Sequence, residues 1–205
     1  MREFIYYSKN ARTSGRFDLT NLMKAGRMDI ACQIVIMAFF VSHAIRDNVK
    51  LHLVFDGPPD APKHLEIFPG KNIQFADTSN RIDISKKDVA GLIKKMLYKY
   101  KKGEKREISS GYNIEKKSLI NLVEELIEQG KEIYIMERKG IDIRDLKRKG
   151  FEKAVFIIGD QDGIPKRELK ELKKLGIKKI SVGRQMYFAS QTLTLIQNEL
   201  DREGI

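Results

Sequence analysis

The sequence of 205 residues has a single cysteine, three histidines and no tryptophan. One cysteine cannot close a disulfide within the chain, and Cys32 lies in an apolar run that predicts a buried thiol. The histidines, His43, His52 and His64, lack the spacing of metal ligands. We therefore expect neither a disulfide framework nor a bound metal.

Long hydrophobic runs are missing as well. The longest apolar run, IVIMAFFV from Ile34, is too short to span a bilayer, and the N-terminal Met-Arg-Glu-Phe lacks the apolar stretch of a signal peptide. We therefore expect a cytoplasmic protein with no membrane partner. With 41% hydrophobic residues the chain can bury a core, and its length fits one domain over residues 1–205.

The sequence also lacks the phosphate-binding motifs G-x-G-x-x-G and G-x-x-x-x-G-K-[ST]. The stretch FIIGDQDGIPKRE, from Phe156, imitates the start of a calcium loop, but Ile164 and Pro165 stand where that loop needs a ligand and a glycine. An apolar strand followed by DQDG is also similar to the motif of haloacid dehalogenase-like phosphotransferases, whose first aspartate is a nucleophile that acts with magnesium. Such a phosphotransferase is the alternative from a different class.

Positive charge is abundant and unevenly distributed. The net charge is +11, of which +7 falls in residues 71–150, with 20 Lys or Arg against 13 Asp or Glu. The densest segment, KKMLYKYKKGEKRE, includes Lys99, Lys101 and Lys102 with tyrosines interleaved. A solvated helix face and a phosphate-binding patch both fit this pattern. The net charge favours a polyanionic partner, so we expect these three lysines to bind nucleic acid in a salt-sensitive manner.

Apolar runs of strand length alternate with amphipathic stretches, which is the pattern of an α/β sheet with helices packed on it. The predicted strands cover residues 3–8, 51–55, 132–136, 154–159 and 178–183. Helical spacing predicts helices over residues 29–46 and 116–130, the second ending at a glycine cap. The segment IFPGKNIQF, residues 67–75, predicts a small hairpin insertion after the second strand.

Three consecutive strands in the last third of the chain end in glycine-bearing loops. The glycines are Gly140 after the first strand, Gly159 and Gly163 after the second, and Gly183 after the third. Ligands of open α/β sheets bind beyond the carboxyl ends of the strands, and glycine lets the backbone approach a ligand closely. Glycine is also ordinary turn chemistry, but three such loops in succession indicate one pocket that recognises its ligand through peptide groups.

Four segments together resemble the archaeal tRNA pseudouridine-54 N1-methyltransferase family, within the SPOUT methyltransferases. They are ARTSGRFDL with AGRMDIACQ, FDGPPDAPK, FIIGDQDGIPKRE, and KKISVGRQMYFASQTLTLIQNELDR. The resemblance runs nearly end to end, and a related methyltransferase of pseudouridine in ribosomal RNA is the alternative with the same fold. It implies a mostly parallel α/β sheet with helices on both faces, a trefoil knot over about residues 130–205, and a homodimer formed across the knot.

The resemblance also implies tRNA as the substrate and S-adenosylmethionine (SAM) as the cofactor, held by the knot loops without a metal. The implied cofactor contacts are Met136, Gly159, Val182, Gly183, Arg184, Gln185, Met186, Tyr187 and Thr192. They fall on the three strand ends that carry the glycines. Asp160 and Asp162 are then expected to structure their turn or to contact RNA.

Methylation of a ring nitrogen needs in-line placement of the methyl group and a base that accepts the N–H proton. We predict Asp60, in a double-proline loop, as that base, although Asp60 and Asp56 are equally suited to solvated or turn-capping roles. Arg27 is the predicted group that stabilises the deprotonated ring, with Arg12 as a second candidate or as an RNA phosphate ligand. Asp29, just before a helix, is predicted to be its N-terminal cap.

Overall fold

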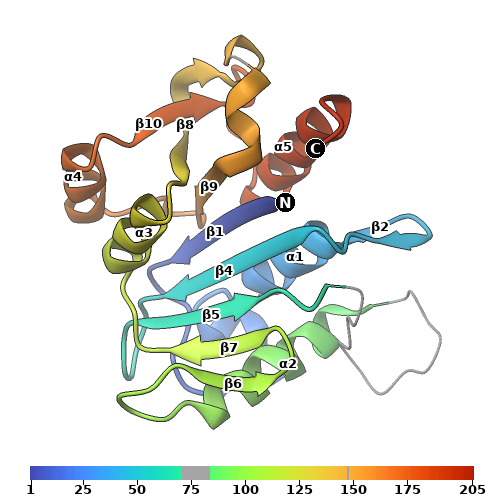
Figure 1. Ribbon diagram of the computed structural model, residues 1–205. Coiled ribbons are helices and arrows are strands. Elements are labelled where there is room, and N and C mark those ends of the chain that lie inside the picture. The colour runs from blue at the N-terminus through green and yellow to red at the C-terminus, as the bar shows by residue number, and fades with distance from the viewer. Residues whose placement is uncertain (71–83, 147) are drawn as a thin grey trace.

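The computed structural model describes residues 1–70, 84–146 and 148–205 (Figure 1). Within these residues, eight strands form one sheet of order β10-β8-β9-β1-β4-β5-β7-β6. Five strands are parallel: β1 (Arg2–Ser8), β4 (Val49–Phe55), β8 (Glu132–Asp142), β9 (Ala154–Gly159) and β10 (Lys178–Ser181). Three antiparallel strands extend the sheet: β5 (Lys63–Ile67), β7 (Tyr112–Glu115) and β6 (Arg106–Ser109).

Helices cover both faces of this sheet. One face carries α1 (Met28–Phe39), α2 (Lys86–Lys99) and α5 (Ala189–Arg202), and the other carries α3 (Leu119–Glu128) and α4 (Lys166–Lys174). In β1, Phe4 and Tyr6 pack on the first side, and Ile5 and Tyr7 on the second. Burial on two faces explains the continuous apolar runs of the parallel strands. The predicted α/β architecture, mostly parallel with helices on both faces, is confirmed.

The five predicted strands correspond to β1, β4, β8, β9 and β10. β8 is longer than predicted because its pairing with β10 resumes after an interruption. Lys179 pairs with Ile135, while the next residue, Ile180, pairs with Ile141. Residues 136–140 therefore form a bulge between two paired segments. β10 ends before Gly183, whose φ of +130° departs from extended strand geometry.

The prediction of one helix over residues 29–46 is wrong after Phe39. The helix ends there, Arg46 donates its amide to the Phe39 carbonyl at 2.7 Å, and the intervening residues form a hairpin whose turn places His43 at a φ of +61°. The Arg46 guanidinium also binds the Asp201 carboxylate of α5 through two hydrogen bonds of 2.7 and 2.6 Å. The remaining short elements are η1 (Leu22–Ala25), β2 (Phe40–Val41), β3 (Ala44–Ile45), η2 (Ile143–Asp145) and η3 (Arg148–Lys153).

The predicted helix over residues 116–130 is confirmed as α3. Its first turn is capped by Ser118, whose Oγ accepts a hydrogen bond from the Asn121 amide at 3.2 Å, and it is followed by Gly130 at a φ of +76°. The hairpin predicted for residues 67–75 extends beyond Gly70 into residues outside the described part of the chain. A different hairpin, formed by β6 and β7, follows α2.

Candidate functional site

The parallel strands direct their carboxyl ends to one edge of the sheet, where the loops with the predicted site residues begin. In the sheet register, Tyr7 of β1 lies between Val54 of β4 and Gly159 of β9. The loops that follow these three strands therefore start side by side, although they are far apart in the sequence. β8 and β10 continue the same edge next to β9.

Asp160 ties the loop after β9 to the loop after β1. One carboxylate oxygen accepts hydrogen bonds from Ser8 Oγ at 2.8 Å and from the Lys9 amide at 3.2 Å. The other accepts the Asp162 amide at 2.9 Å, and Asp162 in turn accepts Asn10 Nδ2 at 2.9 Å. Both oxygens of this buried carboxylate are engaged, so Asp160 structures the turn as expected.

Gly159 is required by the turn that follows it. A Cβ at this position would lie 2.9 Å from the carbonyl carbon of Gly163 and 3.1 Å from the amide nitrogen of Ile164. The turn folds back over the strand end and is closed by the hydrogen bond from the Gly163 amide to the Asp160 carbonyl at 3.0 Å. The side of Gly159 on which a Cβ would stand is therefore covered by the backbone of residues 163 and 164.

The prediction that Gly140 follows its strand is wrong, because β8 continues to Asp142 and Gly140 lies within it, whereas Gly183 follows the end of β10. A Cβ at Gly140 would lie 2.5 Å from the backbone of Ile180, so the bulge of β8 packs directly on β10. Gly183 has open space at the corresponding position. Met136 and Val182 are half-buried against the core, and Thr192 is 9% exposed near the start of α5.

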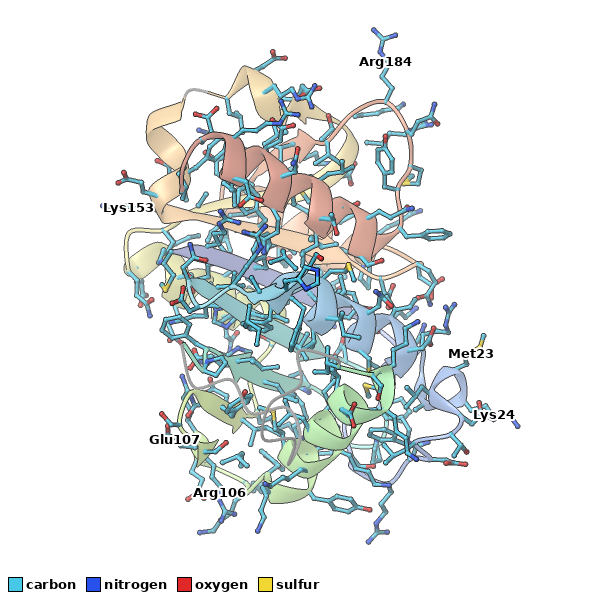
Figure 2. The ribbon with its side chains drawn as sticks, turned by 90° about the vertical axis from the view of Figure 1, so that its right-hand side faces the viewer. Met23, Lys24, Arg106, Glu107, Lys153 and Arg184 are labelled. Atoms are coloured by element: carbon cyan, nitrogen blue, oxygen red, sulfur yellow. The ribbon has the colours of Figure 1, made fainter. Side chains whose placement is uncertain are left out.

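The residues after Gly183 form an exposed, partly apolar segment. Four of the predicted cofactor contacts are exposed here, namely Arg184, Gln185, Met186 and Tyr187. Met186 is 78% exposed and the adjacent Phe188 is 76% exposed. Arg184 projects from one end of the molecule (Figure 2). Large apolar side chains exposed together indicate a surface that a ligand or another protein chain covers.

Asp60 is held between two lysines at the rim of the edge. Lys116 Nζ donates to one carboxylate oxygen, and Lys63 Nζ donates to the other at 2.7 Å. These two hydrogen bonds lower the pKa of Asp60 to about 2. Lys63 is itself buried, with its ammonium 4.0 Å from the centre of the Tyr100 ring. Asp60 is therefore ionised at neutral pH, half exposed, and fixed in position.

Arg27 precedes α1 in the left-handed conformation, at a φ of +63°. Its guanidinium donates to both oxygens of Asp29 at 3.0 Å each, and the hydrogen bonding to Asp29 raises the pKa of Arg27. The helix begins at Met28 without a side-chain cap. The prediction that Asp29 caps this helix is therefore wrong, because its carboxylate binds Arg27 instead.

A single segment, residues 10–13, lies between the loops of Arg27 and Asp60. A Cβ on Gly26 would lie 1.7 Å from the carbonyl oxygen of Asn10, so the turn before Arg27 packs directly on this segment. On the other side, Thr13 Oγ1 donates to the Gly57 carbonyl at 2.9 Å and accepts the Asp60 amide at 2.9 Å. The two predicted catalytic groups thus come from loops that brace the same segment.

Asp56 directly follows β4. Its amide donates to the Ser8 carbonyl at 2.9 Å, and its carboxylate accepts the Tyr7 hydroxyl at 3.0 Å. Burial, together with the charge of Asp56, raises the pKa of Tyr7. These contacts give Asp56 a role in joining β1 and β4 at their carboxyl ends.

The predicted RNA-binding lysines lie at the end of α2 and in the loop after it. Lys99, Lys101 and Lys102 are exposed, and Lys101 lies 3.5 Å from Glu104. The loop after β1 reaches this region, since a Cβ at Gly15 would lie 2.5 Å from the ring of Tyr98. The loop after β1, which carries Arg12 and Arg16, therefore lies next to the basic end of α2.

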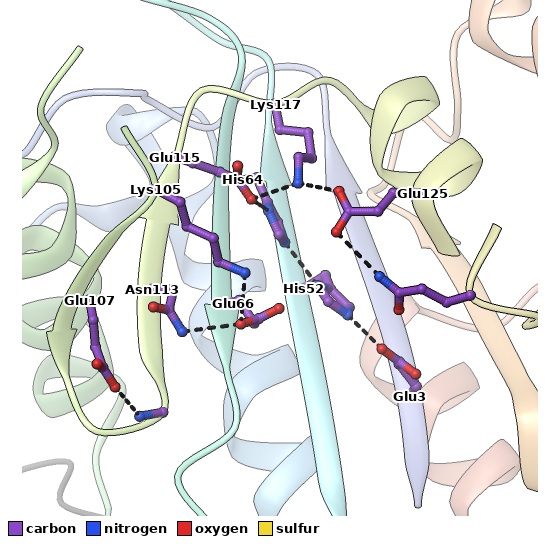
Figure 3. Close-up of polar contacts among 12 residues, drawn as sticks. Glu3, His52, His64, Glu66, Lys105, Glu107, Asn113, Glu115, Lys117 and Glu125 are labelled. Atoms are coloured by element: carbon purple, nitrogen blue, oxygen red, sulfur yellow. Dashed lines mark hydrogen bonds and ion pairs between the residues drawn. The ribbon is translucent and has the colours of Figure 1, made fainter. Parts of the chain in front are cut away.

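A buried chain of hydrogen bonds, which the sequence did not signal, crosses β1, β4, β5 and β7 (Figure 3). Glu3 Oε1 lies 3.0 Å from His52 Nε2, and His52 Nδ1 lies 2.8 Å from His64 Nε2. His64 Nδ1 then lies 3.0 Å from Glu115 Oε1. Both imidazoles are almost completely buried. These residues are neighbours only across the folded sheet, so their sequence spacing forms no motif.

Proton counting sets the direction of these bonds. Although burial opposes it, hydrogen bonds from histidine and lysine neighbours lower the pKa of Glu3 and that of Glu115 to about 2, so both carboxylates only accept. Burial lowers the pKa of His64 to about 4, which leaves its Nε2 as an acceptor. The His64 ring therefore donates from Nδ1 to the Glu115 carboxylate and accepts at Nε2 from His52 Nδ1.

No helix in the described part of the chain is long and apolar enough to cross a membrane. The sequence matches, over residues 1–205, the model of a family described as "Putative SAM-dependent RNA methyltransferase". A protein of Methanosarcina mazei named tRNA (pseudouridine(54)-N(1))-methyltransferase is 34% identical over 204 residues, covering 98% of this chain and 92% of that protein. A Methanocaldococcus jannaschii protein of the same name is 31% identical over 212 residues, covering 100% and 98%.

Among solved structures, the chain is similar in fold to Archaeoglobus fulgidus Nep1, which was crystallised with S-adenosylhomocysteine. The TM-score is 0.62 at 13% sequence identity, and the match covers 99% of this chain and 98% of that one. This likeness concerns the arrangement of the sheet and its helices.

Proposed function

Because the chain belongs to the family of SAM-dependent RNA methyltransferases, we propose that it methylates N1 of pseudouridine at position 54 in the T-loop of tRNA. The family match over residues 1–205 carries this conclusion. The two relatives described above are more than 30% identical over nearly the whole chain, and both are named for that reaction. The chain is accordingly a SAM-dependent enzyme that acts on RNA.

The ends of β8, β9 and β10 fit a bound SAM. Gly183, with a φ of +130° and open space beside it, leaves backbone groups accessible where a Cβ would otherwise stand. The exposed side chains of Met186 and Tyr187 adjoin this position and supply apolar surface. We assign the cofactor contacts to Met136, Gly159, Val182, Gly183, Arg184, Gln185, Met186, Tyr187 and Thr192. Bound there, SAM supplies an activated methyl group.

The protein's own groups have two tasks in this reaction. Transfer of the methyl group from sulfur to N1 of pseudouridine would break the carbon–sulfur bond as the carbon–nitrogen bond forms, and N1 must give up its proton; Asp60 is the carboxylate that we assign as acceptor of this proton. With a pKa of about 2, Asp60 is ionised at neutral pH and can accept a hydrogen bond from N1–H. Because this pKa is low and the side chain is half exposed, the proton would then pass from Asp60 to solvent. Arg27 would stabilise negative charge on the pyrimidine ring.

RNA binding is assigned to Arg12 and to Lys99, Lys101 and Lys102. The proposal includes a trefoil knot over about residues 130–205 and a homodimer in which one protomer supplies the cofactor loops and its partner supplies some RNA contacts. The exposed Met186 and Phe188 favour such an interface because isolated apolar patches of this kind are rarely left in water. As a tRNA-modifying enzyme, the protein would act in the cytoplasm.

The two alternatives fit less well. In a phosphotransferase of the haloacid dehalogenase type Asp160 would be the nucleophile, yet both of its oxygens are occupied by hydrogen-bond donors from Ser8, Lys9 and Asp162. A methyltransferase of ribosomal RNA shares the fold, and the names of the two relatives favour tRNA.

The direct test is incubation of the purified protein with labelled SAM and tRNA transcripts that carry uridine or pseudouridine at position 54. We expect 1-methylpseudouridine in nucleoside mass analysis of the pseudouridine transcript alone. A ribosomal RNA hairpin containing pseudouridine is the competing substrate. Methylation of that hairpin in preference to tRNA, or equal methylation of the uridine transcript, would contradict the proposed substrate.

A further inference from the structure

The loop between β1 and α1 contains a cavity of about 260 Å³, and among its lining residues only Arg12 has a role in the function proposed above. This volume lies below the range of about 300–1,000 Å³ that is usual for whole small-molecule ligands. The residues that line it are mostly cationic or polar and include Arg12, Arg16, Phe17, Asp18, Asn21 and Lys24.

The cations around this cavity have no carboxylate partner in the part of the chain that the structure describes. Within residues 1–70, 84–146 and 148–205, no carboxylate forms an ion pair with Arg12, Arg16 or Lys24. The Nε of Arg12 is buried and has no hydrogen-bond partner among the described residues. A buried guanidinium N–H without an acceptor is unfavourable, and a bound anion would relieve that cost.

The one carboxylate in the lining, Asp18, is engaged with its own turn. Its Oδ1 accepts hydrogen bonds from the amide and the hydroxyl of Thr20, each at 2.8 Å. These bonds lower the pKa of Asp18, so it contributes one negative charge against three cations. The cavity therefore keeps a net positive charge.

The loop that forms the cavity is held in place at both ends by hydrogen bonds to backbone carbonyls and by close packing. At one end the Arg12 amide donates to the Ala25 carbonyl at 3.2 Å. At the other, Lys94 of α2 donates to the Phe17 carbonyl at 2.8 Å, and Gly15 packs on Tyr98. This packing also places the cavity beside the basic end of α2. Met23 and Lys24 project outward together on this side of the molecule (Figure 2).

We propose that this cavity binds one backbone phosphate of the RNA substrate. Arg12 donates from its buried Nε–H, and Arg16 and Lys24 supply the remaining charge. Phosphate contacts of this kind position an RNA without reading its sequence. Because Arg12 belongs to the segment of residues 10–13, and Thr13 of that segment binds the Asp60 amide, a phosphate held here sets the distance from the RNA backbone to the proposed proton acceptor. The inference rests on the RNA methyltransferase function proposed above.

The test compares two variants that each remove two exposed positive charges. Arg16→Gln/Lys24→Gln changes the cavity, and Lys170→Gln/Lys173→Gln changes α4 on the opposite face of the sheet. The affinity for a T-arm hairpin RNA is measured by fluorescence anisotropy at several salt concentrations. Loss of one phosphate contact reduces the slope of log K against log salt by about 1. We expect that reduction in the cavity variant only; an unchanged slope, or an equal change in both variants, would overturn the inference.

A second readout reports on Arg12 itself. Titration of the wild-type protein with inorganic phosphate should shift the NMR signal of the Arg12 Nε–H. The variant Arg12→Lys keeps the positive charge but lacks this N–H group, and it should bind the hairpin RNA with lower affinity than the wild-type protein. An unmoved Nε–H signal together with full affinity in Arg12→Lys would refute phosphate binding here.

The outcome for the proposed function is separate. If the wild-type protein shows the salt effect but neither binds SAM in calorimetry nor methylates RNA, the enzymatic function fails and the phosphate site stands. If it methylates tRNA while the cavity variant binds RNA with an unchanged salt slope, the phosphate site fails and the function stands.

Discussion

The buried histidine chain predicts a loss of stability in mild acid. In the unfolded chain His64 takes up a proton near its ordinary pKa of 6.5, whereas burial delays this in the folded protein until about pH 4. Between these values the unfolded state binds more protons, so the free energy of unfolding falls as the pH falls. The difference between 6.5 and about 4 corresponds to about 3 kcal/mol, of which about 2 kcal/mol is lost by about pH 5.

The pH range in which His64 lowers the stability is separate from the range in which the two carboxylates do so. Glu3 and Glu115 have their pKa lowered from 4.5 to about 2, so the stability that they contribute is present above pH 4.5 and is lost only below it. Urea unfolding at about pH 7 and about pH 5 therefore separates the contribution of His64 from that of these two carboxylates.

The control for this measurement is His43→Asn, which removes an exposed histidine at a positive φ that asparagine tolerates. It should keep the full pH dependence, whereas His64→Asn should flatten it. NMR titration of the His64 ring in the wild-type protein gives the pKa independently of any variant. A ring that titrates near pH 6.5, or equal unfolding free energies at the two pH values, would refute the proton count.

Three further outcomes are expected. Asp60→Asn should lower the rate of methyl transfer by about 10²-fold or more with an unchanged affinity for SAM in calorimetry, and a nearly normal rate would remove Asp60 from the mechanism. Gly159→Ala should destabilise the protein by about 1–3 kcal/mol in urea unfolding because its Cβ meets the Gly163 backbone, while Gly91→Ala, with open space in α2, should stabilise it by about 0.5–1 kcal/mol; equal effects would contradict the close packing. Asp201→Asn should cost about 1–3 kcal/mol because Arg2, 5% exposed, and Arg46 both lose a charged acceptor, and an unchanged melting temperature would count against that pairing.

The sequence predicted the parallel core of the fold well, because strands buried on two faces leave continuous apolar runs that local inspection detects. It failed at residues 40–46, where the helical spacing continues but the Arg46 contacts to Phe39 and Asp201 stabilise a hairpin. Asp201 is 155 residues from Arg46 in the sequence, so no local pattern could reveal this contact.

The candidate site shows the same division. The glycine-bearing ends of β9 and β10 were visible as a pattern, and both strands adjoin β8 in the sheet, but Gly140 lies inside β8 because the strand resumes its pairing with β10 after a bulge. The role of Gly159 in its own turn, the pairing of Arg27 with Asp29, and the chain from Glu3 to Glu115 all depend on contacts between distant or turn-related atoms. Residue type and spacing carry no information about such contacts.

The clasp of residues 10–13 between Gly26 and the Asp60 loop has a consequence for the energetics of substrate capture. Both loops are already immobilised in the folded protein, since neither neighbour leaves room for even a methyl group at Gly26 or Gly57. An RNA that binds at the proposed site would therefore lose little conformational entropy of the protein on docking, and more of the contact energy would be available for unstacking the target base. This edge of the sheet would thus bind RNA as a preformed, rigid surface rather than by closing over it.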